Sequence, residues 1–233
     1  MKDRIKFFAV IFVMAACLFS VGLWKDPQAL NKSGKDKTWN GDYKGAEEDF
    51  TLAIKSSEDP GLYRNRGRAR LYQTNLVGAL SDFNRAIELN SDYAGTYLDR
   101  SDVELKLGKF RESLSDANKY FELPAGQDGD RVKAYFICGW ALQNLQKFNE
   151  AVAAYDAGIA IDSRYPRAFL VRGITKRNLG NWSGAIDDFT KAIEVDTNEA
   201  LAYEARALAY KTKGDLIGFT NDLKLYFRFN KTN

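Results

Sequence analysis

Four arginines in this chain are each followed, sixteen residues later, by an aspartate. A free guanidinium can bind an anion, whereas a bidentate arginine–carboxylate pair clamps two segments of the chain together. In one intervening segment both partners are missing, and Cys138 and Ala154 stand in their places. Because the partners are present together and lost together, we expect structural clamps, with an anion-binding ladder as the alternative. The expected pairs are Arg66 with Asp82, Arg100 with Asp116, Arg172 with Asp188, and Arg206 with Asp222.

Enzymatic chemistry has little support in the composition. The chain contains no histidine, which excludes Ser-His-Asp and Cys-His catalysis and removes the commonest zinc ligand. The sequence also lacks a phosphate-binding loop and a nucleophile elbow. We therefore expect no catalytic residue, no metal site and no cofactor.

The charge is close to balanced. The formal net charge is +3, and the first 24 residues carry Lys2, Arg4 and Lys6 against Asp3, so the remainder is near +1. Proteins that bind nucleic acid usually carry a concentrated basic face. We expect no nucleic-acid partner.

Residues 1–24 are typical of a signal peptide or membrane anchor, because "MKDRIK" precedes an uncharged apolar run at 7–24. The stretch "MAAC" is similar to a bacterial lipobox and would place a lipid on Cys17, making a lipoprotein. Alternatively, cleavage after "SVG" at 20–22 would release a secreted form, or the uncleaved run, about 27 Å long as a helix, would remain as a signal anchor. All three place the body outside the cytoplasm, facing the periplasm or exterior of a bacterial cell envelope, and two attach it to a membrane. Residues 25–38 are polar and are expected to form a tether or a frayed first helix.

A short pattern recurs through the remaining chain. A small alanine is followed after four residues by an aromatic residue and after seven by another small residue, a spacing that keeps all three on one helical face. The alanines are Ala46, Ala79, Ala151 and Ala185, and the aromatics are Phe50, Phe83, Tyr155 and Phe189. A Gly, Thr or Gln marks a turn before each alanine, and a second helical segment precedes that turn. Each unit is therefore expected to be helix, tight turn, helix.

Successive copies are separated by 33, 34, 38, 34 and 34 residues. This period, with the alanine–aromatic spacing, resembles the tetratricopeptide repeat. The resemblance implies an all-α fold, a right-handed superhelical solenoid over 39–233. About six helix-turn-helix units are expected, at 27–59, 60–93, 94–127, 132–165, 166–199 and 200–233.

The resemblance also implies that the first helices of successive units line a concave surface where partner peptides dock. The relevant stripe changes from charged to apolar near the middle of the chain. Exposed apolar patches mark interaction sites, and tryptophan is favoured at their centres. The alternative is that these side chains only pack between neighbouring helices. The expected floor is Phe136, Trp140, Leu170, Ile174 and Leu208, and the expected rim is Lys133, Arg167 and Arg177.

The sequence therefore predicts a non-catalytic scaffold at the cell envelope that binds a protein or peptide partner in its groove. A self-assembling, dimerising envelope subunit is the alternative. It is suggested by the apolar C-terminal stretch "LYFRFN" at 225–230, which has no polar capping helix after it.

Overall fold

A computed structural model describes residues 26–124, 128–164 and 166–230. Across these ranges the chain forms twelve helices and no strand, as expected for an all-α repeat fold. The helices fall into two compact units, which divide after Ser91. Within the described ranges no helix is both long and apolar enough to cross a membrane. The predicted export signal and Cys17 lie outside the described residues.

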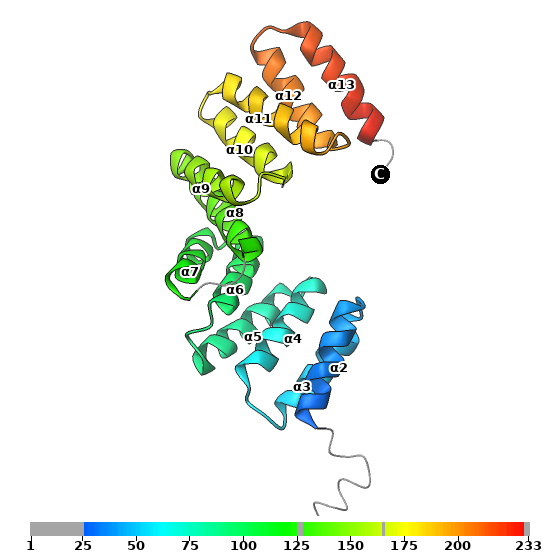
Figure 1. Ribbon diagram of the computed structural model, residues 1–233, viewed down its shortest axis with the longest axis vertical. Coiled ribbons are helices and arrows are strands. Elements are labelled where there is room, and N and C mark those ends of the chain that lie inside the picture. The colour runs from blue at the N-terminus through cyan, green and yellow to red at the C-terminus, as the bar shows by residue number, and fades with distance from the viewer. Residues whose placement is uncertain (1–25, 125–127, 165, 231–233) are drawn as a thin grey trace, which may run out of the picture. The chain divides into compact units, whose positions relative to one another are not determined.

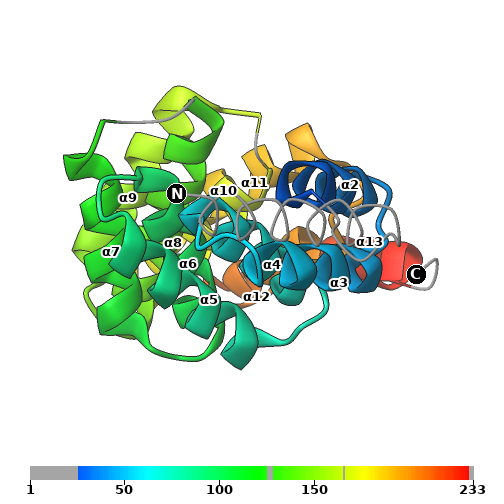
Figure 2. The ribbon, with the colours of Figure 1, turned by 90° about the horizontal axis from the view of Figure 1, so that it is seen from below.

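The first unit contains two helix pairs, which lie side by side in both ribbon views (Figure 1, Figure 2). Each of its helices begins at an aspartate or asparagine whose side chain accepts a hydrogen bond from a free backbone N–H of the first turn. Residues 25–38, for which a tether or a frayed helix was expected, mostly belong to its first helix, which buries Leu30 and Gly34. The helices are α2 (Pro27–Trp39), α3 (Tyr43–Ile54), α4 (Pro60–Tyr72) and α5 (Leu76–Leu89).

The second unit contains four helix pairs, and each helix packs on its neighbours along the chain. The first helices of successive pairs also contact each other: α6 contacts α8, and α8 contacts α10. The helices are α6 (Ala94–Lys106), α7 (Phe110–Glu122), α8 (Asp128–Asn144), α9 (Phe148–Ile161), α10 (Pro166–Asn178), α11 (Trp182–Val195), α12 (Ala200–Thr212) and α13 (Leu216–Asn230).

Three residues join the helices of every pair, and the middle one always has a positive φ. Glycine adopts this left-handed conformation without steric cost, whereas other residues are strained there. Two pairs nevertheless use Thr74, with φ 62°, and Gln146, with φ 61°. The turn is thus retained by the repeat even where its residue is unfavourable. The glycines are Gly41, Gly108, Gly180 and Gly214.

In four of the six described helix pairs, an aromatic ring of the second helix lies against a glycine of the first helix. A Cβ added at Gly67 would come within 2.7 Å of Phe83, and one added at Gly139 within 2.4 Å of Tyr155. In α6 and α7 the same two positions are Ser101 and Ala117, both fully buried. A serine thus replaces the smaller glycine and an alanine replaces the larger aromatic residue, and these opposite changes partly conserve the volume of the core.

Candidate functional site

The structure joins each of the four expected arginine–aspartate pairs across its own helix pair. Arg66 donates from Nε to Asp82 Oδ2 at 3.0 Å and from Nη2 to Oδ1 at 2.6 Å. The other three pairs have the same bidentate arrangement, with distances of 2.5 to 2.9 Å. All four aspartates are buried. Because each carboxylate already faces a guanidinium inside a helix pair, these groups act as clamps between helices.

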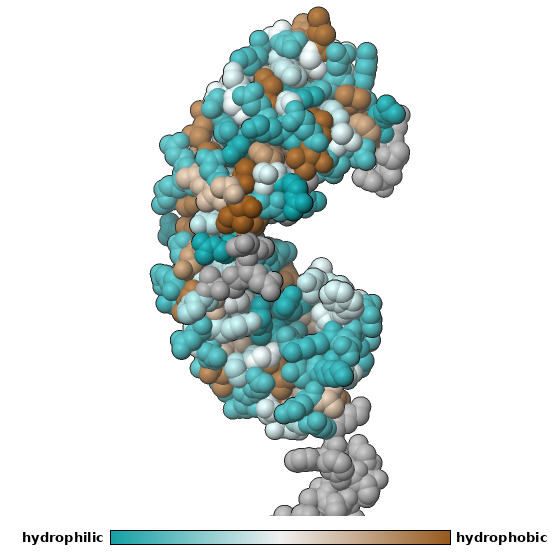
Figure 3. Space-filling view, in the orientation of Figure 1, coloured by the Kyte–Doolittle hydropathy of each residue, from teal (hydrophilic) through white to brown (hydrophobic). Residues whose placement is uncertain are grey.

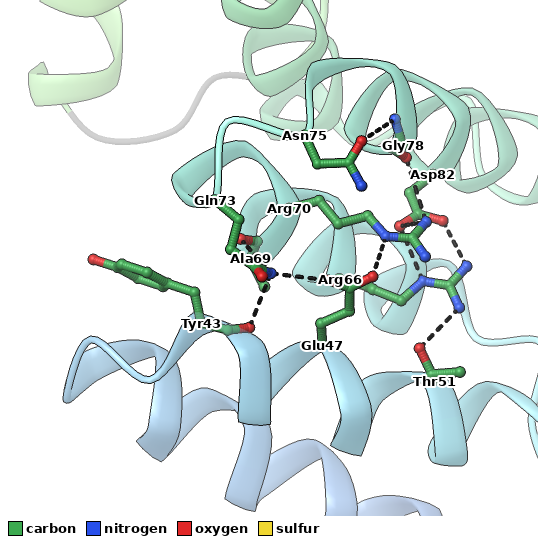
Figure 4. A network of polar contacts seen from close by, with 10 residues as sticks. All are labelled: Tyr43, Glu47, Thr51, Arg66, Ala69, Arg70, Gln73, Asn75, Gly78 and Asp82. Carbon is green, nitrogen blue, oxygen red and sulfur yellow. Dashed lines mark hydrogen bonds and ion pairs between the residues drawn. The ribbon is translucent and has the colours of Figure 1, made fainter.

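A second cation, which the sequence reasoning missed, reaches the same aspartate from four residues after the arginine. Arg70 donates to Asp82 at 2.9 Å and also to Glu47 of α3 at 2.7 Å (Figure 4). Lys176 likewise contacts Asp188 at 2.9 Å. The one signal for this position is its place one helical turn beyond the arginine, on the same helical face.

In α2 the second position holds a cation, although the first position has no arginine. Its counterpart of the arginine is Ser33, which donates to Asp49 at 2.6 Å, and Lys37 supplies the positive charge at 2.7 Å from that carboxylate. Because a serine, not an arginine, stands sixteen residues before Asp49, the arginine–aspartate spacing predicts no partner for this carboxylate.

In α6 this second position carries an acid, Glu104. Its side chain lies beside Asp116 and is only 7% exposed, and its Oε2 has no hydrogen-bond partner among the described residues. Burial, and then the neighbouring Asp116, raise the pKa of Glu104 to about 7. In the pairs α4–α5 and α10–α11, two cations meet one carboxylate. In the pair α6–α7, one arginine meets two carboxyl groups.

In α8 the arginine position is Cys138, as the sequence shows. The thiol is buried, and burial raises its pKa to about 12. A thiol with this pKa is not a nucleophile at neutral pH. The residue packs as a small apolar side chain beside Ala134 and Ile137.

A cavity of about 1020 Å³ opens in the second unit along α6, α8 and α10. Trp140 of α8 lines it with 55% of its surface exposed. Apolar surface also appears among hydrophilic residues at the level of α8 and α10 in Figure 3. We call this cavity the groove. Its apolar lining comprises Leu105, Val132, Phe136, Ile137, Trp140, Ile161 and Val171.

The charged lining of the groove is partly neutralised. Lys106 and Lys133 both contact Asp102, the latter at 3.1 Å. Burial would raise the pKa of Asp102, but the two lysines outweigh this effect and hold its pKa below the ordinary value. Arg164 lies 3.7 Å from Asp162. Arg167 makes no ion pair with any residue that the structure describes.

The structure brings together four of the eight residues expected in the groove: Phe136, Trp140, Lys133 and Arg167. Leu170 was expected on the floor and is instead buried at 6% exposure, packed in the core with Phe189. Ile174 is half-buried against the same core. Leu208 is exposed, but neither it nor Arg177 lines this cavity. Leu98, Phe136 and Leu170 occupy one repeat position, which faces a neighbouring helix more than the position of Trp140 does.

A second apolar surface lies on α13. Leu216 is 65% exposed and Phe227 is 53% exposed. The corresponding residues of α11, one repeat earlier, are Trp182 and Ile193, which pack in the core that includes residues of α12. In Figure 3 an apolar patch is visible where α13 begins. Among the described residues, no helix covers the face of α13 that corresponds to the packed face of α11.

Pairs of helices joined by three-residue turns, with repeated clamps, define an all-α helical repeat protein. Residues 132–165 match the family model described as Tetratricopeptide repeat. This match places one tetratricopeptide repeat at residues 132–165, and the six described helix pairs have the helix-turn-helix form that the sequence period predicted.

Curated relatives match parts of the chain. Protein SGT1 homolog of Oryza sativa subsp. japonica is 36% identical over 106 residues, which cover 44% of this chain and 28% of the relative. Dynein axonemal assembly factor 4 of Rattus norvegicus is 27% identical over 118 residues, which cover 49% and 28%. Serine/threonine-protein phosphatase 5 of Homo sapiens is 28% identical over 133 residues, covering 57% and 26%. The chain spans less than a third of the length of these relatives.

Solved structures share the fold. PilW, described as a widely conserved type IV pilus biogenesis factor, superposes with a TM-score of 0.76 at 18% identity, covering 84% of this chain and 90% of that one. YrrB, described as a TPR protein with an unusual peptide-binding site, superposes with a TM-score of 0.63 at 20% identity, covering 77% and 91%.

Proposed function

We propose that the protein is a non-catalytic scaffold that binds a peptide segment of a partner protein in the groove. The observation that carries this proposal is the half-exposed Trp140 in a cavity of about 1020 Å³. A tryptophan in a concave, mostly apolar site gains much contact area when a partner covers it, and such residues dominate binding energies. YrrB, a protein of the same fold, has a peptide-binding site.

The alternative, in which Trp140 serves only to pack helices, is less consistent with its exposure. Its neighbours along α8, Ile137 and Ala141, are buried and supply the packing between helices. Removal of the Trp140 side chain should therefore leave most of the core intact.

Selection from a displayed library of random peptides tests the proposal. The full chain and its Trp140→Ala variant would be used as targets in parallel, with thermal melting of both. We expect peptides that bind the wild-type chain and lose binding on the variant, while the melting temperature changes little. Peptides that bind both targets equally, or a variant that fails to fold, would contradict the proposed groove.

We also propose that residues 1–24 direct the scaffold out of the cytoplasm to a bacterial cell envelope, as a lipoprotein, a signal-anchored protein or a cleaved secreted product. The basic start and the uncharged run at 7–24 support this proposal. Mass spectrometry of the mature N-terminus tests it. Lipid on Cys17, an intact apolar run in a membrane fraction, or cleavage near residue 22 would each support export, and an intact chain free in the cytoplasm would contradict it.

A second candidate function is self-assembly through α13. It is favoured by the open face of that helix, where Leu216 and Phe227 stand in positions that pack against a neighbouring helix in α11. A second copy would cover this face and remove apolar surface from water. Light scattering of the protein and of a Leu216→Glu/Phe227→Glu variant tests it. A wild-type chain that stays monomeric at high concentration would contradict self-assembly.

A further inference from the structure

Two cations of the groove occupy the same position in successive repeats. Lys133 lies in α8 and Arg167 in α10, 34 residues apart, and both line the cavity that contains Trp140. The same position in α6 is Gly95 and in α12 is Leu201. Within the second unit the paired cations are thus confined to the two helices at the centre of the groove.

The groove carries an excess of positive charge. Four cations and two carboxylates belong to its lining, which leaves a formal charge of +2. Asp102 is shared between Lys106 and Lys133, so it neutralises only one of these two lysines. The second uncompensated positive charge is Arg167, which is exposed and has no ion pair among the described residues.

These charges lie beside an apolar floor. Phe136 and Trp140 follow Lys133 by three and seven residues, so all three project from neighbouring turns on one side of α8. A ligand that covers the floor must bring groups close to Lys133 and Arg167. Those groups are favoured when they are negatively charged and disfavoured when they are positive.

We propose, resting on the peptide-binding function proposed above, that the occupant of the groove is an acidic peptide segment with one aromatic or large aliphatic anchor. The anchor covers Trp140, and carboxylates of the segment pair with Lys133 and Arg167. Packed helices lie about 10 Å apart and an extended chain rises about 3.3 Å per residue. Because alternate side chains of an extended segment share a face, the two carboxylates are about two or four residues apart.

A single-stranded nucleic acid fits the same lining less well. Such ligands are usually held by several stacking aromatics along a continuous basic track. Here Trp140 is the large exposed aromatic among the groove residues described, and Asp102 and Asp162 interrupt the basic lining. A phosphate backbone would meet those carboxylates, whereas a peptide with separated acids can avoid them.

The test uses peptides selected from the random library on the full chain and their binding to charge variants. We expect the selected peptides to be enriched in Asp and Glu near an aromatic or aliphatic residue. Affinity should fall about tenfold in a Lys133→Glu/Arg167→Glu variant and should weaken with added salt. A peptide with its acids replaced by lysine should bind the wild-type chain poorly and should regain affinity on this variant.

Matched controls separate charge from folding. Arg111→Glu makes one such charge reversal on the exposed surface of α7, outside the groove, and should leave affinity within about twofold. Lys133→Gln/Arg167→Gln removes the charges without adding new repulsion and covers the case in which the glutamate variant is unstable. This variant should still lose several-fold in affinity with an unchanged melting temperature.

The outcomes distinguish the two proposals. Peptides that depend on Trp140 but show no acidic enrichment, and that bind the charge variants unchanged, would overturn the acidic occupant and keep the groove. If no selected peptide depends on Trp140, both proposals are overturned. Preferential binding of polyuridine, with loss on the charge variants, would overturn the peptide in favour of nucleic acid.

Discussion

Arg66 and Asp82 form a two-point clamp between α4 and α5, with the guanidinium Nε and Nη2 facing the two carboxylate oxygens at 3.0 and 2.6 Å. Arg70 adds a third hydrogen bond to the same carboxylate and carries the contact on to Glu47 of α3 (Figure 4). A single buried aspartate therefore joins two helices directly and a third through its partner.

Replacement of Asp82 by alanine should destabilise the protein by about 3 kcal/mol, because two arginines lose the buried carboxylate that neutralises them. Chemical denaturation followed by circular dichroism measures this. Glu88→Ala is the matched control, since Glu88 pairs with Arg85 on the exposed surface and should contribute less than about 1 kcal/mol. An unchanged free energy of unfolding for Asp82→Ala would contradict the clamp.

Glu104 should make stability depend on pH. Its pKa is raised from the ordinary value near 4.5 to about 7 in the folded protein, so the native state keeps a proton that the unfolded state releases. The free energy of unfolding should then fall as pH rises from about 4.5 to 7, by an amount on the order of 1–3 kcal/mol. Glu104→Gln should remove this fall and be more stable than the wild-type chain at pH 8.

Urea denaturation at pH 5 and pH 8 of both proteins measures the effect of Glu104. Glu122→Gln serves as control, because Glu122 is exposed and pairs with Lys119 on its own helix. Parallel pH dependence in the wild-type chain and Glu104→Gln would show that Glu104 is not the responsible group.

Gln146→Gly should stabilise the protein by about 1 kcal/mol. Gln146 holds a φ of 61° in a turn where four other repeats have glycine, and a left-handed conformation costs a side-chain-bearing residue about 1–2 kcal/mol. The gain is reduced by the greater freedom of glycine in the unfolded chain. Gly180→Gln, the reverse change in another repeat, should destabilise the protein. If Gln146→Gly lowers the free energy of unfolding, the turn is not the source of strain.

The glycine–aromatic contact should behave as a coupled pair. Gly67→Ser places atoms against Phe83, whose ring lies 2.7 Å from an added Cβ, and should cost about 1–3 kcal/mol. The double variant Gly67→Ser/Phe83→Ala copies Ser101 and Ala117 of α6 and α7. It should lose less stability than the sum of its two single changes. Strict additivity in a double-mutant cycle would contradict the proposed compensation.

The repeat period predicted the features that depend on spacing alone. It gave the helix pairs, the turn residues, and the partners of Arg66, Arg100, Arg172 and Arg206, because these recur at fixed intervals within each unit. The second cation, as in Arg70 and Lys176, was missed because its position is occupied by Glu104, Leu142 and Tyr210 in other repeats. A position that is not uniform gives no periodic signal.

The groove was predicted only in part for a different reason. Phe136 and Leu170 occupy equivalent positions, yet Leu170 is buried with Phe189 while Phe136 lines the cavity. The difference arises from how each first helix packs on its neighbour, which depends on side-chain volumes in two repeats at once. The sharing of Asp102 by Lys106 and Lys133 joins α6 to α8 and is likewise invisible to a pattern within one repeat.

The most direct test of the central claim is a titration of one library-selected peptide into the wild-type chain, Trp140→Ala and Trp39→Ala. Trp39 is 91% exposed and lies in the first unit, so its removal matches the loss of an exposed indole outside the groove. We predict that Trp140→Ala weakens binding by at least about tenfold, that Trp39→Ala leaves it unchanged, and that both variants melt near the wild-type temperature. Equal affinity of the wild-type chain and Trp140→Ala would contradict the groove as the binding site.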